Sequence, residues 1–200
     1  MEKPPRIILA SGSAIRADIL RGAGVPFDIV KPGVDESVIK RAAKEDGADL
    51  EDIAMMLAEA KCLAVARETK GLVIGSDQIM EFKGEAYDKP ASMEEARTRL
   101  LQMQGAAHTL INAVALARDG AVIWRHIDQP RLVMRPLSEQ EIDDYLSAAG
   151  PEILHSVGAY QIEKLGSRLF ERIEGDQFAV LGLSLFPLLD ALRGEEALLF

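Results

Sequence analysis

Cysteine, long apolar runs and an excess of positive charge are all missing from this sequence. Cys62 is the single cysteine, so an internal disulfide is impossible, which fits a reducing compartment. No apolar run has the length of a membrane-spanning helix, and residues 1–5 are too polar and too short for a signal peptide. We therefore expect a cytoplasmic protein without a membrane segment.

The charge balance argues against a further class of function. The chain carries 23 Lys and Arg residues against 32 Asp and Glu residues, for a net charge of −9. A non-specific nucleic-acid binder needs a broad basic surface, so we expect no nucleic-acid partner. A small anionic ligand remains compatible, because a few cations in a cleft can dominate the local potential. The 200 residues, 48% of them hydrophobic, are expected to form a single domain over residues 1–200.

Residues 72–80 hold the feature around which the chain is predicted to be organised. The apolar run 72–74 is typical of a buried strand, Gly75 is expected to end it, and Asp77 to follow its tip. Open α/β sheets bind their ligands beyond the carboxyl ends of such strands, where the backbone is rigid enough to hold a metal or a water. The alternative is that Asp77 is only a turn residue, which is the commoner use of aspartate after glycine.

An anion site is predicted near the N-terminus. Residues 6–10 read as a strand, residues 11–13 as a turn, and residues 14–22 as a helix with Ser13 as its N-cap. A helix N-terminus after a small-residue turn offers backbone N–H groups and the positive end of the dipole, and Arg16 could reach an anion there. The alternative is that Ser13 merely caps the helix and Arg16 is solvated.

Two lysines stand in unusual settings. The helix expected over residues 51–69 has an apolar stripe, and Lys61 falls near the middle of it. Such a lysine either snorkels out to water, which is the commoner outcome, or meets an anion in a cleft. Lys89 is held extended by Pro90, outside any helix.

The other elements follow from periodicity and from turn and capping signals. His108 and His126 fall within expected strands, and without a second ligand at metal-binding spacing we interpret both as structural. Capping boxes at 92–95 and 138–141 open helices that end near Gly105 and Gly150. A helix is also expected over 38–45 and another over 183–192, interrupted at Pro187, while strands are expected over 26–30, 107–117, 121–134, 168–173 and 178–181, with a hairpin tip at Lys83-Gly84.

Several short segments occur in one order along the chain. They are LASGSAIR at 9–16, DE at 35–36, LAEAK at 57–61, IGSDQ at 74–78, KP at 89–90, His108, GAY at 158–160 and GL at 182–183. Their order and spacing resemble the Maf family of nucleoside triphosphate pyrophosphatases over nearly the whole chain. The resemblance implies an α/β fold like that of inosine triphosphate pyrophosphatases, in which a long mixed β-sheet with flanking helices forms two lobes around a cleft.

The resemblance also implies an activity and roles for individual residues. The activity is hydrolysis of a nucleoside triphosphate to the monophosphate and pyrophosphate with a divalent cation, Mg²⁺ or Mn²⁺, in nucleotide-pool sanitation. The implied roles are catalysis for Asp77 (as the base), Lys61 and Lys89, phosphate binding for Ser11, Ser13 and Arg16, and metal binding for Glu36 and Asp77. The chemistry agrees, since cations must compensate a triphosphate and Mg²⁺ prefers oxygen ligands.

Departures from the commonest family pattern indicate the substrate. An apolar residue stands at Ile15 instead of an arginine, Gln78 stands where many members have threonine, and Glu163 where they have glutamine. These three look like the branch that acts on 7-methyl-GTP. A carboxylate accepts hydrogen bonds from the two donors on the guanine edge, and an apolar neighbour suits a methylated, cationic base. A lysine that many members carry near Ser156 is absent, so how the phosphate charge is completed stays open.

Three alternatives remain at this point. The first is the dTTP and UTP activity of the other branch, and the second is a nucleotide-binding regulator of cell division with little turnover. The third is an α/β domain whose motifs only cap helices and form turns. The sequence does not determine the oligomeric state, and a homodimer is compatible with it.

Overall fold

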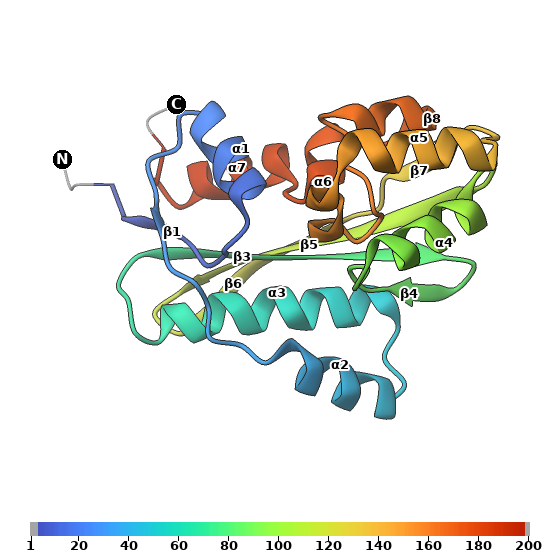
Figure 1. The fold of residues 1–200 in the computed structure, drawn as a ribbon. Helices are drawn as coiled ribbons and strands as arrows, with labels where there is room; N and C mark the ends of the chain where they lie inside the picture. The colour runs from blue at the N-terminus through green and yellow to red at the C-terminus, as the bar shows by residue number, and fades with distance from the viewer. Residues whose placement is uncertain (1–3, 199–200) are drawn as a thin grey trace.

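A computed structural model describes residues 4–198, which form a mixed β-sheet covered by helices on both faces (Figure 1). The elements in chain order are β1 (Ile7–Leu9), α1 (Ala14–Gly22), β2 (Asp28–Ile29), α2 (Glu36–Glu45), α3 (Leu50–Ala66), β3 (Leu72–Phe82), β4 (Glu85–Tyr87), α4 (Met93–Met103), β5 (Ala107–Arg118), β6 (Ala121–Asp128), β7 (Arg131–Met134), α5 (Glu139–Ala149), the 3₁₀ turns η1 (Pro151–His155) and η2 (Leu165–Leu169), β8 (Phe170–Glu174), α6 (Gln177–Leu181) and α7 (Leu185–Gly194). The predicted fold class, a long mixed sheet with flanking helices, is confirmed.

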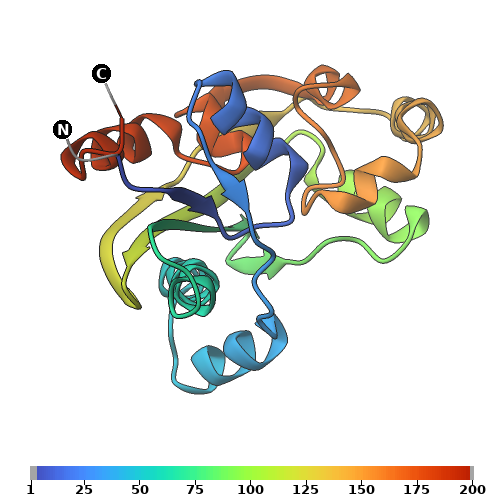
Figure 2. The ribbon, with the colours of Figure 1, turned by 90° about the vertical axis from the view of Figure 1, so that its left-hand side faces the viewer.

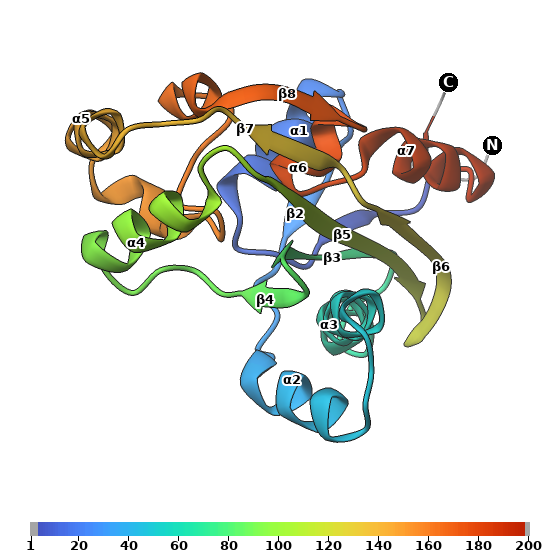
Figure 3. The same ribbon diagram turned by 90° about the vertical axis from the view of Figure 1, so that its right-hand side faces the viewer.

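The sheet is organised around two long neighbouring strands. Its order is β2-β1-β3-β5-β7-β8, with β4 paired to β3 and β6 paired to β5. β1 runs parallel to β2 and β3, and the other pairings are antiparallel. β3 and β5 pair from Leu72↔Arg118 to Glu81↔Thr109 and so span most of the length of the sheet. Figure 3 shows α3 nearly end-on against one face, with α1, α6 and α7 on the other; Figure 2 gives the opposite view.

Strand alternation sends neighbouring residues of β3 to different helices. Val73 and Ile79 pack in the cluster that contains α3, whereas Leu72 and Ile74 pack in the cluster that contains α1 and α7. Because successive side chains on a strand point to opposite faces, Asp77 lies on the α3 face. Ser76 and Gln78 lie on the opposite face, as their contacts with Gly182 and with α6 confirm.

The prediction that Gly75 ends the strand, with Asp77 beyond its tip, is wrong. β3 runs without a break from Leu72 to Phe82, and Asp77 lies in its middle. Gly75 is needed because α3 crosses the strand there: a Cβ at Gly75 would lie 2.2 Å from the carbonyl oxygen of Ala58 and 2.8 Å from Cβ of Cys62. Glycine therefore marks a close approach of helix and strand at this position.

Three other predicted elements differ from the structure. The segment 178–181 belongs to α6 and is not a strand, because the Asp176 side chain accepts a hydrogen bond from the Ala179 N–H and caps a helix. The strand expected over 121–134 divides into β6 and β7 around Pro130, which has no N–H for a continuous ladder. Pro187 does not interrupt α7, since it lies in the first turn, where its missing N–H breaks no helical hydrogen bond.

The remaining boundaries shift by small amounts. β8 begins at Phe170, two residues later than predicted, because a 3₁₀ turn precedes it. The hairpin tip at Lys83-Gly84 is confirmed, with φ values of 56° and 84°. Over residues 4–198, no helix is long and apolar enough to cross a membrane.

Candidate active site

A cleft of about 1240 Å³ opens along β3. Its walls come from the N-terminus of α1, from α2 and α3, from the segment between β4 and α4, and from residues 152–164. All ten residues that the sequence assigns to the site line this cleft: Ser11, Ser13, Ile15, Arg16, Glu36, Lys61, Asp77, Gln78, Lys89 and Glu163. The structure thus brings the predicted residues together, and their individual roles remain predictions.

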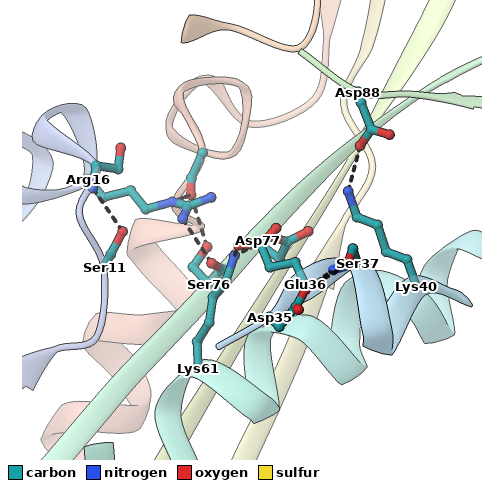
Figure 4. A network of polar contacts seen from close by, with 12 residues as sticks. Ser11, Arg16, Asp35, Glu36, Ser37, Lys40, Lys61, Ser76, Asp77 and Asp88 are labelled. Carbon is teal, nitrogen blue, oxygen red and sulfur yellow. Dashed lines mark hydrogen bonds and ion pairs between the residues drawn. The ribbon is translucent and has the colours of Figure 1, made fainter. Parts of the chain in front are cut away.

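A buried lysine joins two carboxylates at the bottom of the cleft (Figure 4). Lys61 is 8% exposed, and its Nζ lies 2.6 Å from Oδ1 of Asp77 and 2.7 Å from Oε1 of Glu36. α3 and β3 run in opposite directions, so the direction toward the N-terminus of α3 is the direction toward the C-terminus of β3. Helical side chains lean toward the helix N-terminus, and Lys61 therefore reaches Asp77. The commoner outcome expected from the sequence, snorkelling into water, is wrong, and the alternative of an anion in a cleft is correct.

This network favours the ionised form of Glu36. Partial burial opposes ionisation of Glu36, but the hydrogen bond and positive charge of Lys61 outweigh it and lower the Glu36 pKa. Burial also lowers the pKa of Arg16, against the attraction of the nearby Asp77 and Glu36. The floor of the cleft therefore holds two carboxylates and two cations within mutual electrostatic reach.

The N-terminus of α1 has no side-chain cap. Ser13 occupies the predicted N-cap position, yet its hydroxyl makes no capping hydrogen bond. Its backbone N–H instead donates to Oγ of Ser11, at 3.1 Å. The first-turn residues Ala14, Ile15 and Arg16 line the cleft. The first N–H groups of a helix have no intrahelical partner, so this end of α1 is suited to bind an anion.

Arg16 and Gln78 are fixed by backbone carbonyls on the face opposite α3. Nε of Arg16 donates to the carbonyl of Gly182 at 2.7 Å, and a terminal nitrogen donates to the carbonyl of Ser76 at 2.8 Å. The alternative that Arg16 is merely solvated is therefore wrong. Nε2 of Gln78 donates to the carbonyls of Ala179 and Val180, at 2.8 Å and 3.2 Å. This leaves the amide oxygen of Gln78, a cleft residue, as an acceptor.

The donor set fits a hard divalent cation held jointly with a substrate. Glu36 and Asp77 converge on the single ammonium of Lys61, and each keeps a second carboxylate oxygen. Over residues 4–198 no group of three His, Cys, Asp or Glu residues forms a metal site. A cation held by two carboxylates would need phosphate oxygens and water to complete its shell, which is the usual arrangement for Mg²⁺.

Sequence reasoning missed Lys40 and Arg99. Nζ of Lys40, on α2, lies 2.5 Å from Oδ1 of Asp88, and this contact links α2 to the segment that carries Lys89. Arg99 is 5% exposed and donates to the carbonyls of Asp88 and Val157, so it ties together two segments of the cleft wall. Arg99 lies on the apolar stripe of α4. A basic residue on an apolar stripe also singles out Lys61 on α3, so the same signal could have indicated Arg99.

Cations gather in the cleft although the whole chain is acidic. Seven Lys and Arg residues line the cleft against six Asp and Glu residues, whereas the net charge of the chain is −9. Lys31, Lys44 and Lys164 belong to this set and were not predicted. A cleft with this balance can accept a polyanion that the rest of the surface would repel.

His108 and His126 lie outside this cluster of charges, whereas His155, at the end of η1, lines the cleft. His108 is buried, and its Nε2 lies 2.7 Å from the hydroxyl of Tyr160, a cleft residue. His126 stacks on Trp124 of β6. Both arrangements agree with the structural interpretation made from the sequence.

Comparison with known proteins identifies the relatives of this fold and site. The family model described as "Maf-like protein" matches residues 6–195. A "nucleoside triphosphate pyrophosphatase" of Hyphomonas neptunium is 46% identical over 192 residues, which cover 96% of this chain and 97% of that protein. A "7-methyl-GTP pyrophosphatase" of Rhizobium meliloti is 44% identical over 190 residues, which cover 94% and 96%. A solved nucleoside-triphosphatase (dITP/XTP pyrophosphatase) of Mycobacterium abscessus is more distant, with 14% identity and a TM-score of 0.41 over 96% of this chain and 95% of that one.

Proposed function

Because this chain belongs to the Maf family, we propose that its cleft hydrolyses a nucleoside triphosphate to the monophosphate and pyrophosphate, with 7-methyl-GTP as the preferred substrate. The observation that carries the proposal is the buried contact of Lys61 with Asp77 and Glu36 beside the uncapped N-terminus of α1. Carboxylates and anion-binding groups meet there in one cleft. A cytoplasmic enzyme with this activity would remove non-standard nucleotides from the pool.

Asp77 is proposed as the general base. Its Oδ1 is held by Lys61, and the second oxygen remains to accept a proton from the attacking water. The water forms a bond to phosphorus as the bond between the α-phosphorus and the bridging oxygen breaks, and pyrophosphate leaves. Lys61 holds Asp77 in position for this step, while Lys89, exposed at the cleft wall, is proposed to contact the phosphates.

Glu36 and Asp77 are proposed to hold a divalent cation, Mg²⁺ or Mn²⁺, together with the phosphates. When bound, such a cation neutralises phosphate oxygens and lowers the pKa of a coordinated water. Ser11, Ser13 and the first turn of α1 are proposed to hold the phosphates from the other side.

The preference for 7-methyl-GTP rests on three residues at the cleft. The free amide oxygen of Gln78 and the exposed carboxylate of Glu163 are both acceptors, and the guanine edge offers two donors. Ile15 adds an apolar surface to the cleft. A thymine or uracil ring offers one N–H donor and would leave an acceptor without a partner, at a cost of about 1–3 kcal/mol.

The test is release of pyrophosphate from a panel of triphosphates with Mg²⁺ or Mn²⁺. We expect 7-methyl-GTP to give the highest kcat/KM, and we expect EDTA to abolish turnover and excess Mg²⁺ to restore it. A higher kcat/KM for dTTP and UTP would contradict the base preference. Tight nucleotide binding without product over hours would contradict catalysis and favour a regulatory role.

A further inference from the structure

The cations that the sequence assigned to the triphosphate are largely engaged by the protein itself. Lys61 contacts Glu36 and Asp77, and Arg16 spends two of its N–H groups on backbone carbonyls. Lys40, a further cation of the cleft, is paired with Asp88. A triphosphate carries about four negative charges and needs cations whose donors are still available. Among the cations that the sequence assigned, Lys89 alone has no such protein partner within residues 4–198, and one lysine does not balance a triphosphate, so a further phosphate contact is expected in the cleft.

Lys31 is placed beside the phosphate loop by the pairing of β1 and β2. The parallel register aligns Leu9 with Ile29, and the Val30 N–H continues the ladder to the carbonyl of Leu9, at 3.1 Å. Continued in the same register, Ala10 lies beside Val30, and one residue further along each segment Ser11 lies beside Lys31. Pro32 follows and restricts Lys31 to an extended backbone, just as Pro90 does for Lys89.

The stem of Lys31 packs along Gly12. A Cβ at Gly12 would lie 3.6 Å from Cε of Lys31 and 3.9 Å from its Cδ and Cγ. The ammonium group follows Cε directly, so it lies at the loop formed by Ser11, Gly12 and Ser13. Lys31 lines the cleft, and within residues 4–198 its ammonium has neither a hydrogen-bond nor an ion-pair partner.

We propose that Lys31 is a phosphate-binding residue that works with the N-terminus of α1 on the outer phosphates of the triphosphate. This inference rests on the proposed function and deepens it. Asp77 is buried and Lys31 is exposed, so the reacting phosphorus lies at the bottom of the cleft and Lys31 meets the β- and γ-phosphates nearer its mouth. Lys31 thereby supplies positive charge that the absent lysine near Ser156 does not.

The experiment measures binding without turnover. Dissociation constants are determined by calorimetry with Mg²⁺ for α,β-methylene analogues of 7-methyl-GTP and of dTTP, and for the two monophosphates. The variants are Lys31→Gln, Lys31→Arg and, as a matched control, Lys70→Gln, which removes an exposed lysine that does not line the cleft. We expect Lys31→Gln to weaken binding of the triphosphate analogues about tenfold or more, as for loss of one charge-assisted hydrogen bond.

The same variant should leave monophosphate binding within about twofold, and Lys31→Arg should keep triphosphate affinity within about threefold, because it retains the charge. If Lys31→Gln binds the triphosphate analogues as tightly as Lys70→Gln does, the role of Lys31 is wrong while the proposed function stands. If the wild-type protein binds neither analogue, the proposed function fails and the role of Lys31 fails with it.

Discussion

Helices α1 and α5 both begin after a serine, but only one of the two serines caps its helix. Ser138 accepts a hydrogen bond from the Glu141 N–H at 3.2 Å, and Glu141 accepts one from the Ser138 N–H at 2.9 Å. This capping box satisfies donors at the N-terminus of α5. Ser13 makes no such bond, and Arg16 occupies the position that corresponds to Glu141. An arginine cannot accept hydrogen bonds, so the N-terminus of α1 stays open to an external anion.

The difference extends to the surroundings of the two helices. Near α5, Arg97 is paired with Asp143 and Glu139, so the charges of that region satisfy one another at the surface. In the cleft, Asp77 and Glu36 share one lysine and keep free oxygens. Paired groups stabilise a fold, whereas groups with unused capacity can bind a ligand. The same residue types therefore stabilise the fold near α5 and are available to bind a ligand in the cleft.

The largest difference in kcat is expected between variants of two aspartates that are each paired with a basic side chain. Asp77→Asn should lower kcat about 10³-fold, because an amide cannot take the proton from water. Asp143→Asn, which loosens the contact with Arg97 at 2.5 Å, should leave kcat unchanged. Steady-state pyrophosphate release from both purified variants decides this. Full activity in Asp77→Asn, or an equal loss in both variants, would remove the distinction between the two regions.

Lowering the pH should reduce the free energy of unfolding through His108. Burial lowers the pKa of His108 to about 4 from the ordinary value of 6.5. As the pH falls below 6.5 the unfolded chain binds a proton that the folded chain does not, so the free energy of unfolding decreases until the pH is below about 4. The expected loss is up to about 3 kcal/mol.

Urea unfolding between pH 7 and pH 4 measures this contribution. His108→Phe should remove it, and Tyr160→Phe should keep it, because burial and not the contact with the tyrosine hydroxyl lowers the pKa. An unchanged pH dependence in His108→Phe would show that other groups are responsible.

The smallest effects are expected from substitution of the two serines. One substitution should lower stability, and the other should weaken substrate binding. Ser138→Ala should lower the free energy of unfolding by about 1 kcal/mol, as for loss of an N-cap, and leave kcat/KM unchanged. Ser13→Ala should change stability little, since no cap is lost, and raise the KM for the triphosphate several-fold. Urea unfolding and steady-state kinetics on the same preparations reveal the pattern. Equal stability losses in the two variants would mean that α1 is an ordinary capped helix.

The sequence predicted the membership of the site better than its geometry. Motif order brought together residues from six separate segments, and all of them line one cleft. The resemblance to the family also implied the fold class, and periodicity with capping signals predicted most helices. The strand through Asp77 was missed because Gly75 reads locally as a break, and only the position of α3 shows that it permits close packing.

Other errors have the same physical origin. Lys61 is an unfavourable residue on an apolar stripe until Glu36 and Asp77, distant in the sequence, meet it. Lys31 shares with Lys89 only the proline that follows it, and its place beside Gly12 follows from the pairing of β1 with β2. The apolar residues of α6 are too few to show a helical period, so the sequence pattern favours a strand there, and only the Asp176 cap indicates a helix. In each case contacts between segments distant in the sequence determine the secondary structure or the side-chain environment, which the local sequence does not specify.

Hydrolysis of 7-methyl-GTP in ¹⁸O-labelled water tests how the triphosphate lies relative to Asp77. Gln78 lies next to Asp77 and is proposed to face the base, while the N-terminus of α1 is proposed to hold the outer phosphates, so the water beside Asp77 should attack the α-phosphorus. Mass spectrometry of the products should then find the label in 7-methyl-GMP and none in pyrophosphate. Label in pyrophosphate, or release of inorganic phosphate instead, would contradict the proposed placement of the triphosphate in the cleft.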